Sequence, residues 1–341
     1  MDIRFKISSF LKSFWCAFKG FFLKEEKATR LILGELDLAD VFISLAPISI
    51  FGCLLFGLRA VVVLLVCTLI PVIFDFLWEL IFRKEKRNIN LTVALQGLIL
   101  GLTVSSQLNI FLVIASSVLL WALSKFVIKD SPLKLVFAVL IVRVVLGAIF
   151  YNAFKVYNFP FLDTEAQMLP FDYIFKATSF MPSAKYLFFG LHSGNIGETS
   201  VMLLLLGGIY LMLRKIINPI IPCGFLVSVS VLSLVFGRSI TISLLGGSLF
   251  FGIFIMAIDY SFITDARYKK ILFGVICGSL TFVLREIFKA EAVFLAILIT
   301  YMVFLYINLK NIRTVFNFFK NLDYKGFISK IAAKFRKSEK E

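Results

Sequence analysis

Residues 190–200 read GLHSGNIGETS, a polar stretch punctuated by glycines, and the apolar run VMLLLLGGIYLML follows it at once. Gly194 and Gly197 precede Glu198 and Thr199, and the run after them has the composition of a helix. The first amides of a helix have no partner within it, and the helix dipole places positive charge there. This loop therefore suits an anion or the carbonyl of a planar ring.

The same residues also suit a helix cap that binds no ligand. Ser193 or Asn195 would then be the N-cap, and Glu198 would lie in the first turn, where its charge is favourable. His192 is the only histidine, and without a partner it indicates neither a metal site nor acid–base catalysis. The five cysteines are scattered and form no C-x-x-C pair, so we predict no metal site and no iron–sulfur cluster held by this chain alone.

Acidic residues in or beside apolar segments form a second group of candidate functional residues, because a charge in a bilayer is costly and is seldom kept without a role. Asp75 and Glu79 lie four residues apart, on one face of a helix, and Arg83 follows them. Asp40 and Asp259 lie at the ends of two other apolar segments. Such acids indicate either an ion pathway or simple pairing with nearby arginine and lysine at the membrane interface.

These residues must be positioned by helices that cross a membrane. Of 341 residues, 60% are hydrophobic and 17% charged, and the mean hydropathy is +0.95. The apolar residues fall in blocks of about 20, the length of a membrane span. We predict an all-α, polytopic integral membrane protein with about ten transmembrane helices, at residues 41–57, 60–82, 91–107, 109–128, 133–154, 199–213, 221–237, 241–259, 270–286 and 291–309.

Lysine and arginine set the orientation, since they favour the cytoplasmic side. They are divided roughly four to one in favour of the side that holds the N-terminus, so both termini are predicted to be cytoplasmic. The predicted parts are an amphipathic segment, 1–40, a membrane domain, 41–309, with an extracytoplasmic loop, 155–198, and a basic tail, 310–341. The net charge of +15 follows from this bias and from attraction to anionic lipid, and it requires no nucleic-acid partner.

The long loop divides the ten helices into five and five. An odd number per half inverts the second half relative to the first, as in transporters built from inverted repeats. GLILGL, in the third helix, and SLLGGSLFFG, in the eighth, are both rich in glycine and lie at corresponding places. These glycines either let helices pack closely or leave room for a planar ligand between the halves.

Several segments together resemble the RnfD/NqrB family, the membrane subunits of Rnf-type and sodium-pumping NADH:quinone-type complexes. The resemblance covers roughly residues 40 to 290. It rests on these segments, in order: DVFISLAPISIFGCLLFGLRA, NINLTVALQGLILGLTV, GNIGETSVMLLLLGGIYLMLRKIINPIIP and FGIFIMAIDYSFITDARYKKILFGVICGSLTFVLR. Asp40, Asp259 and Arg143 match charged positions of the family, and the length is closer to the RnfD type.

The resemblance implies an FMN joined through its phosphate to a threonine by an extracytoplasmic flavin transferase, in a motif of the form D-x-x-S/T-G-A-T. The matching stretch here is DYIFKAT, which aligns Asp172, Ala177 and the acceptor Thr178, while Phe175 and Lys176 depart from the motif. The loop of Gly194, Gly197, Glu198 and Thr199 would then be the second wall of the flavin pocket. The family's N-P-A and D-P-V-T-S-P motifs are absent, which argues against a second, noncovalent flavin such as riboflavin.

The resemblance thus implies a membrane subunit of an Rnf-like complex in the bacterial inner membrane, which carries electrons through FMN and contributes to cation translocation. Its partners would be other membrane and peripheral subunits, the transferase and the bilayer. No G-x-G-x-x-G fingerprint is present, so we predict no catalytic residues and no catalysis by this chain alone. The alternatives are a flavin-free structural subunit of such a complex and a channel-like transporter of small solutes.

Overall fold

The described part of the chain consists of helices joined by turns and loops. The computed structural model describes residues 35–82, 90–127, 135–149, 184–192, 194–246, 248–256, 258, 267–288 and 292–309, and these contain helices and turns but no strand. The predicted all-α class is therefore confirmed for these residues. Contacts divide the chain into two compact units, Phe22–Tyr301 and the two terminal segments, Met1–Phe21 and Met302–Glu341, and of the second unit only the end of one helix is described.

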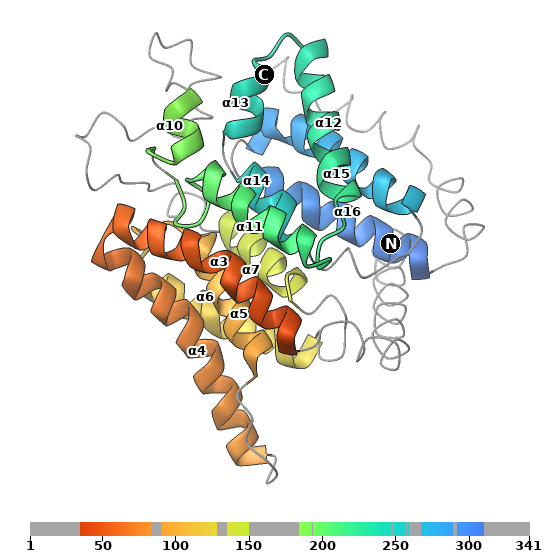
Figure 1. Ribbon diagram of the computed structural model, residues 1–341. Helices are drawn as coiled ribbons and strands as arrows, with labels where there is room; N and C mark the ends of the chain where they lie inside the picture. The colour runs from red at the N-terminus through yellow and green to blue at the C-terminus, as the bar shows by residue number, and fades with distance from the viewer. Residues whose placement is uncertain are drawn as a thin grey trace, which may run out of the picture. The chain divides into compact units, whose positions relative to one another are not determined.

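The helices up to residue 149 correspond to the first five predicted ranges (Figure 1). They are α3 (Glu35–Phe56), α4 (Leu58–Phe82), α5 (Leu91–Leu102), α6 (Ile110–Ala122) with the π-helical turn η1 (Leu123–Val127), and α7 (Phe137–Ile149). Asn90 and Asn109 begin α5 and α6, because the side chain of each accepts a hydrogen bond from the backbone amide two residues on.

The helices after residue 183 correspond to the other five ranges, with a short helix added in front (Figure 1). They are α10 (Ala184–Phe189), α11 (Val201–Leu213), α12 (Ile220–Val235), α13 (Ile240–Leu245), α14 (Leu249–Phe251) with the π-helical turn η4 (Gly252–Met256), α15 (Arg267–Phe288) and α16 (Ala292–Leu309).

Two predicted helices are shorter than expected, and they occupy corresponding places. The third was expected to reach residue 107 but ends at Leu102, where the polar stretch TVSSQ begins. The eighth was expected to be continuous, but it is interrupted between Leu245 and Leu249, at the sequence Gly-Gly-Ser. The early end of α5 and the interruption after α13 both coincide with residues that weaken a helix, since serine and threonine compete for backbone hydrogen bonds and glycine costs entropy in a helix.

Within the part of the chain that the structure describes, two helical segments are long and apolar enough to cross a membrane, Asp37–Phe56 and Leu58–Ile81. Six further apolar segments of 10–17 residues are helical but shorter. The number of ten transmembrane helices therefore stays a prediction. Large aliphatic side chains are exposed along the longer pair, such as Leu54 and Leu65, as expected for surfaces that face lipid.

Two pairs of helices distant in sequence lie antiparallel. At one end of α3, Asp40 bonds to Arg214 beyond α11, and one turn further along α3 the backbone of Ser44 approaches Gly207 of α11. In the same way, Phe137 of α7 packs against Tyr301 of α16, and Arg143 lies over the ring of Phe294. The first helices of the two predicted halves are thus paired in opposite directions, and so are the fifth helices.

The glycines of the third helix are used for close packing. A Cβ added to Gly97 would lie 2.2 Å from the carbonyl oxygen of Cys67, and one added to Gly101 would lie 3.0 Å from the Leu64 side chain. Both contacts join α5 to α4. The packing interpretation of GLILGL is therefore the one that the geometry supports, because the backbone of α4 fills the space beside Gly97 and side chains of α4 fill the space beside Gly101.

Candidate functional site

The loop at residues 194–200 lies inside the molecule, against the turn that ends α5. All seven residues are buried. The amide of Gly197 donates to the carbonyl of Leu102 over 2.8 Å, and the amide of Ile196 donates to the carbonyl of Val104 over 3.2 Å. The loop that leads into the second half is therefore bonded directly to the helix break of the first half.

Two glycines allow this close approach. A Cβ on Gly197 would lie 2.6 Å from Cβ of Leu102, and a Cβ on Gly52 of α3 would lie 2.6 Å from the carbonyl oxygen of Ile196. Contacts below 3 Å cannot be accommodated without movement of the backbone. Residues 196 and 197 are consequently wedged between α3 and the end of α5.

The start of α11 differs from both candidates for its cap. Its N-cap is Ser200, whose hydroxyl accepts a hydrogen bond from the amide of Leu203 at 3.4 Å. Asn195 lies too far before Val201 to cap this helix, and Glu198 precedes the helix instead of lying in its first turn. The capping interpretation was wrong because residues 196–198 form a turn outside the helix, so the helix begins later than the sequence pattern indicated.

In the predicted second wall of the pocket, several backbone amides already donate hydrogen bonds within the protein. Ile196 and Gly197 donate to the break after α5, and Glu198 donates to the carbonyl of Asn195 at 3.2 Å. A ring carbonyl or an anion could not draw on these three amides without breaking those bonds. The side chains of Glu198 and Thr199 are buried, and the carbonyl of Thr199 lies 3.0 Å from Nε2 of His192. The role of this loop as a wall stays a prediction.

Arg143 completes the set of donors around the end of α5. It is fully buried, and its Nε donates to the carbonyl of Thr103 over 3.0 Å. With the two amides above, protein donors satisfy three successive carbonyls, those of Leu102, Thr103 and Val104. Such carbonyls end a helix without an internal partner, so a buried break requires donors of this kind.

A second buried arginine meets the break in the second half. Arg285 of α15 donates from Nη1 to the carbonyl of Ser243 over 2.6 Å and from Nη2 to the carbonyl of Gly246 over 3.0 Å. These carbonyls lie in the last turn of α13 and at its C-cap. Arg285 is buried, at only 3% exposure.

The acid at the start of α3 is paired with residues at the end of α11. One carboxylate oxygen of Asp40 accepts a hydrogen bond from the hydroxyl of Tyr210 at 2.7 Å, and the other accepts one from Nε of Arg214, also at 2.7 Å. This hydrogen bond raises the pKa of Arg214. For Asp40, the geometry therefore supports pairing over an ion pathway.

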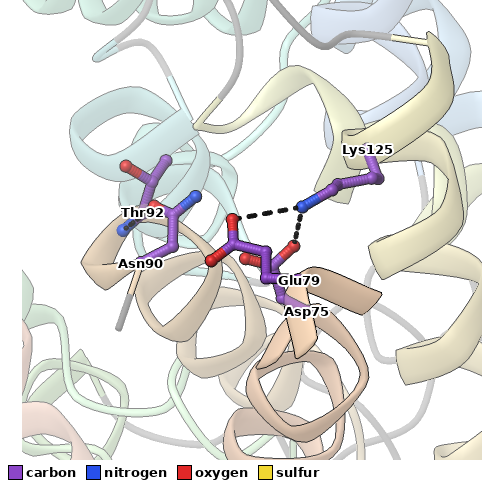
Figure 2. Close-up of polar contacts among 5 residues, drawn as sticks. All are labelled: Asp75, Glu79, Asn90, Thr92 and Lys125. Carbon is purple, nitrogen blue, oxygen red and sulfur yellow. Dashed lines mark hydrogen bonds and ion pairs between the residues drawn. The ribbon is translucent and has the colours of Figure 1, made fainter. Parts of the chain in front are cut away.

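The acids of α4 are also paired, as Figure 2 shows. Nζ of Lys125, from the π-helical turn η1, lies 2.6 Å from Asp75 and 3.5 Å from Glu79. The sequence indicated the two acids but not their partner. Lys125 is 50 residues away from Asp75, and the two meet only when the helix that carries Lys125 packs against α4.

The other predicted site residues lie outside the described part of the chain. They are Asp172, Ala177 and Thr178 of the flavinylation motif, together with Ser193, Arg83 and Asp259. Among the described residues, no three histidine, cysteine or acidic side chains are placed to hold a metal ion together.

Comparison with known proteins extends over most of the chain. Residues 36–316 match the model of the NQR2, RnfD, RnfE family. The D subunit of the Na⁺-translocating ferredoxin:NAD⁺ oxidoreductase complex of Acetobacterium woodii is 26% identical over 251 residues, which cover 72% of this chain and 79% of that protein. The D subunit of the proton-translocating ferredoxin:NAD⁺ oxidoreductase complex of Clostridium ljungdahlii is 25% identical over 269 residues, with 72% and 80% covered. The D subunit of an ion-translocating oxidoreductase complex of Stutzerimonas stutzeri is 35% identical over 107 residues, with 29% and 30% covered.

Proposed function

Because the chain belongs to the NQR2, RnfD, RnfE family, we propose that it is a membrane subunit of an ion-translocating oxidoreductase complex of the Rnf type. The family match over residues 36–316 carries this proposal, since it includes both predicted halves. Its partners are the other membrane and peripheral subunits of that complex. It contributes to cation translocation, and the names of its relatives include both sodium and proton translocation.

In this proposal, ten helices in two inverted halves cross the bacterial inner membrane, with both termini in the cytoplasm. The antiparallel pairing of α3 with the end of α11, and of α7 with α16, supports the inverted arrangement. The shortened helix α5 and the interrupted helix α13–α14 occupy the same place in each half, which is a second feature of inverted repeats.

We also propose that electrons pass through an FMN attached to Thr178. The sequence DYIFKAT supports this attachment, and the predicted topology puts it on the side where the transferase works. FMN supplies one- and two-electron chemistry when it is bound. Three amides of this loop, those of Ile196, Gly197 and Glu198, do not fit the ring as donors, since they already bond to protein carbonyls. We therefore assign those amides no part in electron transfer.

The attachment can be tested on the chain coexpressed with a flavin transferase. Mass spectrometry should find an increment of the size of FMN on a peptide that contains Thr178. The increment should disappear in Thr178→Ala and persist in Thr164→Ala, which removes another threonine of the same loop. An unlabelled native chain would argue against the proposal.

A flavin-free structural subunit is the second candidate, and the departures at Phe175 and Lys176 favour it. The double change Phe175→Ser with Lys176→Gly restores the motif around Thr178. If the restored chain is folded, lies in the membrane and still shows no flavin fluorescence in a gel, the structural role is the better account. Copurification with the other subunits tests membership of the complex separately.

A further inference from the structure

Each helix break ends in carbonyl groups that a buried guanidinium contacts. In the first half the acceptor is Thr103, the C-cap of α5, and the donor is Arg143 of α7. In the second half the acceptors are Ser243 and Gly246, and the donor is Arg285 of α15. The two arginines come from different positions in their halves, the fifth helix and the fourth, so repetition of one residue does not explain the similarity.

The carbonyl end of an interrupted helix attracts positive charge. Its last carbonyls lack internal partners, and the helix dipole makes this end negative. In a membrane interior no water screens this charge, and the unwound carbonyls of broken helices in transporters are places where mobile cations bind. A guanidinium offers the same positive charge with several donors in a fixed plane, and it stays charged under all ordinary conditions.

We propose that Arg143 and Arg285 are built-in cations that occupy the carbonyl site of each break and keep mobile cations out of it. The geometry at Arg285 supports this most directly, because its two terminal nitrogens bond to two carbonyls at the end of α13, one in its last turn and one at its C-cap. At Arg143 the neighbouring carbonyls of Leu102 and Val104 are taken by the amides of Gly197 and Ile196, so the guanidinium closes the remaining position. This inference goes beyond the proposed redox role and does not depend on it.

The test uses the purified full chain in detergent and measures its melting temperature. Arg285→Ala should melt roughly 10 °C lower than the unaltered chain, because two hydrogen bonds from a charged donor are lost. Ethylguanidinium contains the atoms that this substitution removes, and it should restore most of the loss in a saturable manner. Ethylurea has the same shape without the charge and should restore little. Equal recovery with both compounds would show that volume matters and charge does not, and would overturn the proposal.

Sodium chloride tests the exclusion of mobile cations. It should stabilise Arg285→Ala more than it stabilises the unaltered chain, at matched ionic strength, since the vacated carbonyls become available to the ion. Equal responses to sodium would overturn the claim that the arginine keeps cations out. Arg59→Ala is the control, because Arg59 is exposed and its partner is the side chain of Gln107 instead of a helix end.

A second pair of variants decides the matter if Arg285→Ala does not fold. Arg285→Lys keeps the positive charge, and Arg285→Met has a similar length without it. Membrane accumulation and melting temperature should be clearly higher for the lysine variant. If methionine serves as well as lysine, a cation is not required at the break. Arg143→Lys and Arg143→Met should differ in the same direction.

Discussion

Residues 194–200 have the types expected of an anion site, and the same types serve an internal purpose here. An amide that could face a phosphate or a ring carbonyl can equally face a protein carbonyl, and Ile196 and Gly197 donate to Val104 and Leu102. The glycine at 197 is required by the contact with Leu102. At this scale, the loop is a connector between the entry to α11 and the break after α5.

The first prediction concerns Gly197 and its neighbour Gly194. Gly197→Ala should lower the free energy of unfolding by about 2 kcal/mol or more, because its Cβ would lie 2.6 Å from Cβ of Leu102 and 3.1 Å from the Leu102 carbonyl oxygen. Gly194→Ala is the matched control, since its Cβ would come no closer than 3.3 Å, to the Thr199 methyl group. Thermal unfolding in detergent measures both, and equal melting temperatures would contradict this account of the loop.

Helices of this protein are joined where small residues let their backbones meet. The pair α12–α15 is an example: a Cβ on Gly274 would lie 2.5 Å from the carbonyl oxygen of Ile221, and one on Gly278 would lie 2.7 Å from that of Phe225. Within a bilayer, apolar side chains gain little by leaving lipid, so close packing of this kind supplies much of the association between helices.

A prediction at the scale of the element follows for Gly278. Gly278→Val should separate α15 from α12 and lower the melting temperature by roughly 5 °C or more, because the side chain would overlap the Ser228 hydroxyl and the Phe225 backbone. Ser279→Val places the same side chain one position further along, where the hydroxyl that it replaces is exposed. This control should melt within a few degrees of the unaltered chain, and an equal loss in both variants would contradict the packing argument.

Within the unit Phe22–Tyr301, the helices of the two predicted halves make similar contacts, and the two halves run in opposite directions. In each half the second helix packs against the third and the fourth: α4 against α5 and α6, and α12 against α13 and α15. The first helices of the halves pair with each other in opposite directions. This pattern is what two similar five-helix units of opposite orientation would produce.

Topology is the prediction at the scale of the whole molecule. In a chain freed of its native cysteines, single cysteines near Lys86 and Arg336 should react only with reagents that reach the cytoplasm, because the positive-inside bias places these segments there. A cysteine near Asp163 should react with impermeant reagents added from outside. Labelling of the Asp163 loop from the cytoplasm alone would reverse the orientation.

Helix positions were largely predictable because they depend on local composition. Apolar runs of sufficient length and the turn residues between them located a helix in every predicted range, and the membrane class followed from hydropathy. The end of α5 and the interruption after α13 were missed, although Thr103, Ser105 and Gly246 lie in the sequence there. These residues are compatible with a helix, and only a buried partner for the freed carbonyls makes a break stable in a membrane.

Composition and charge alone therefore determined that this is a helical membrane protein and that most of its lysine and arginine residues fall on one predicted side of the membrane. Both conclusions come from adding up the properties of local segments. The tertiary structure decided which groups meet. It paired Lys125 with Asp75, directed the amides of residues 196 and 197 to the turn after α5, and buried Arg285 against the carbonyls of α13. The partners in these contacts lie about 40 to 95 residues apart in the sequence. A local sequence pattern does not predict such contacts, because they form only when the helices pack together.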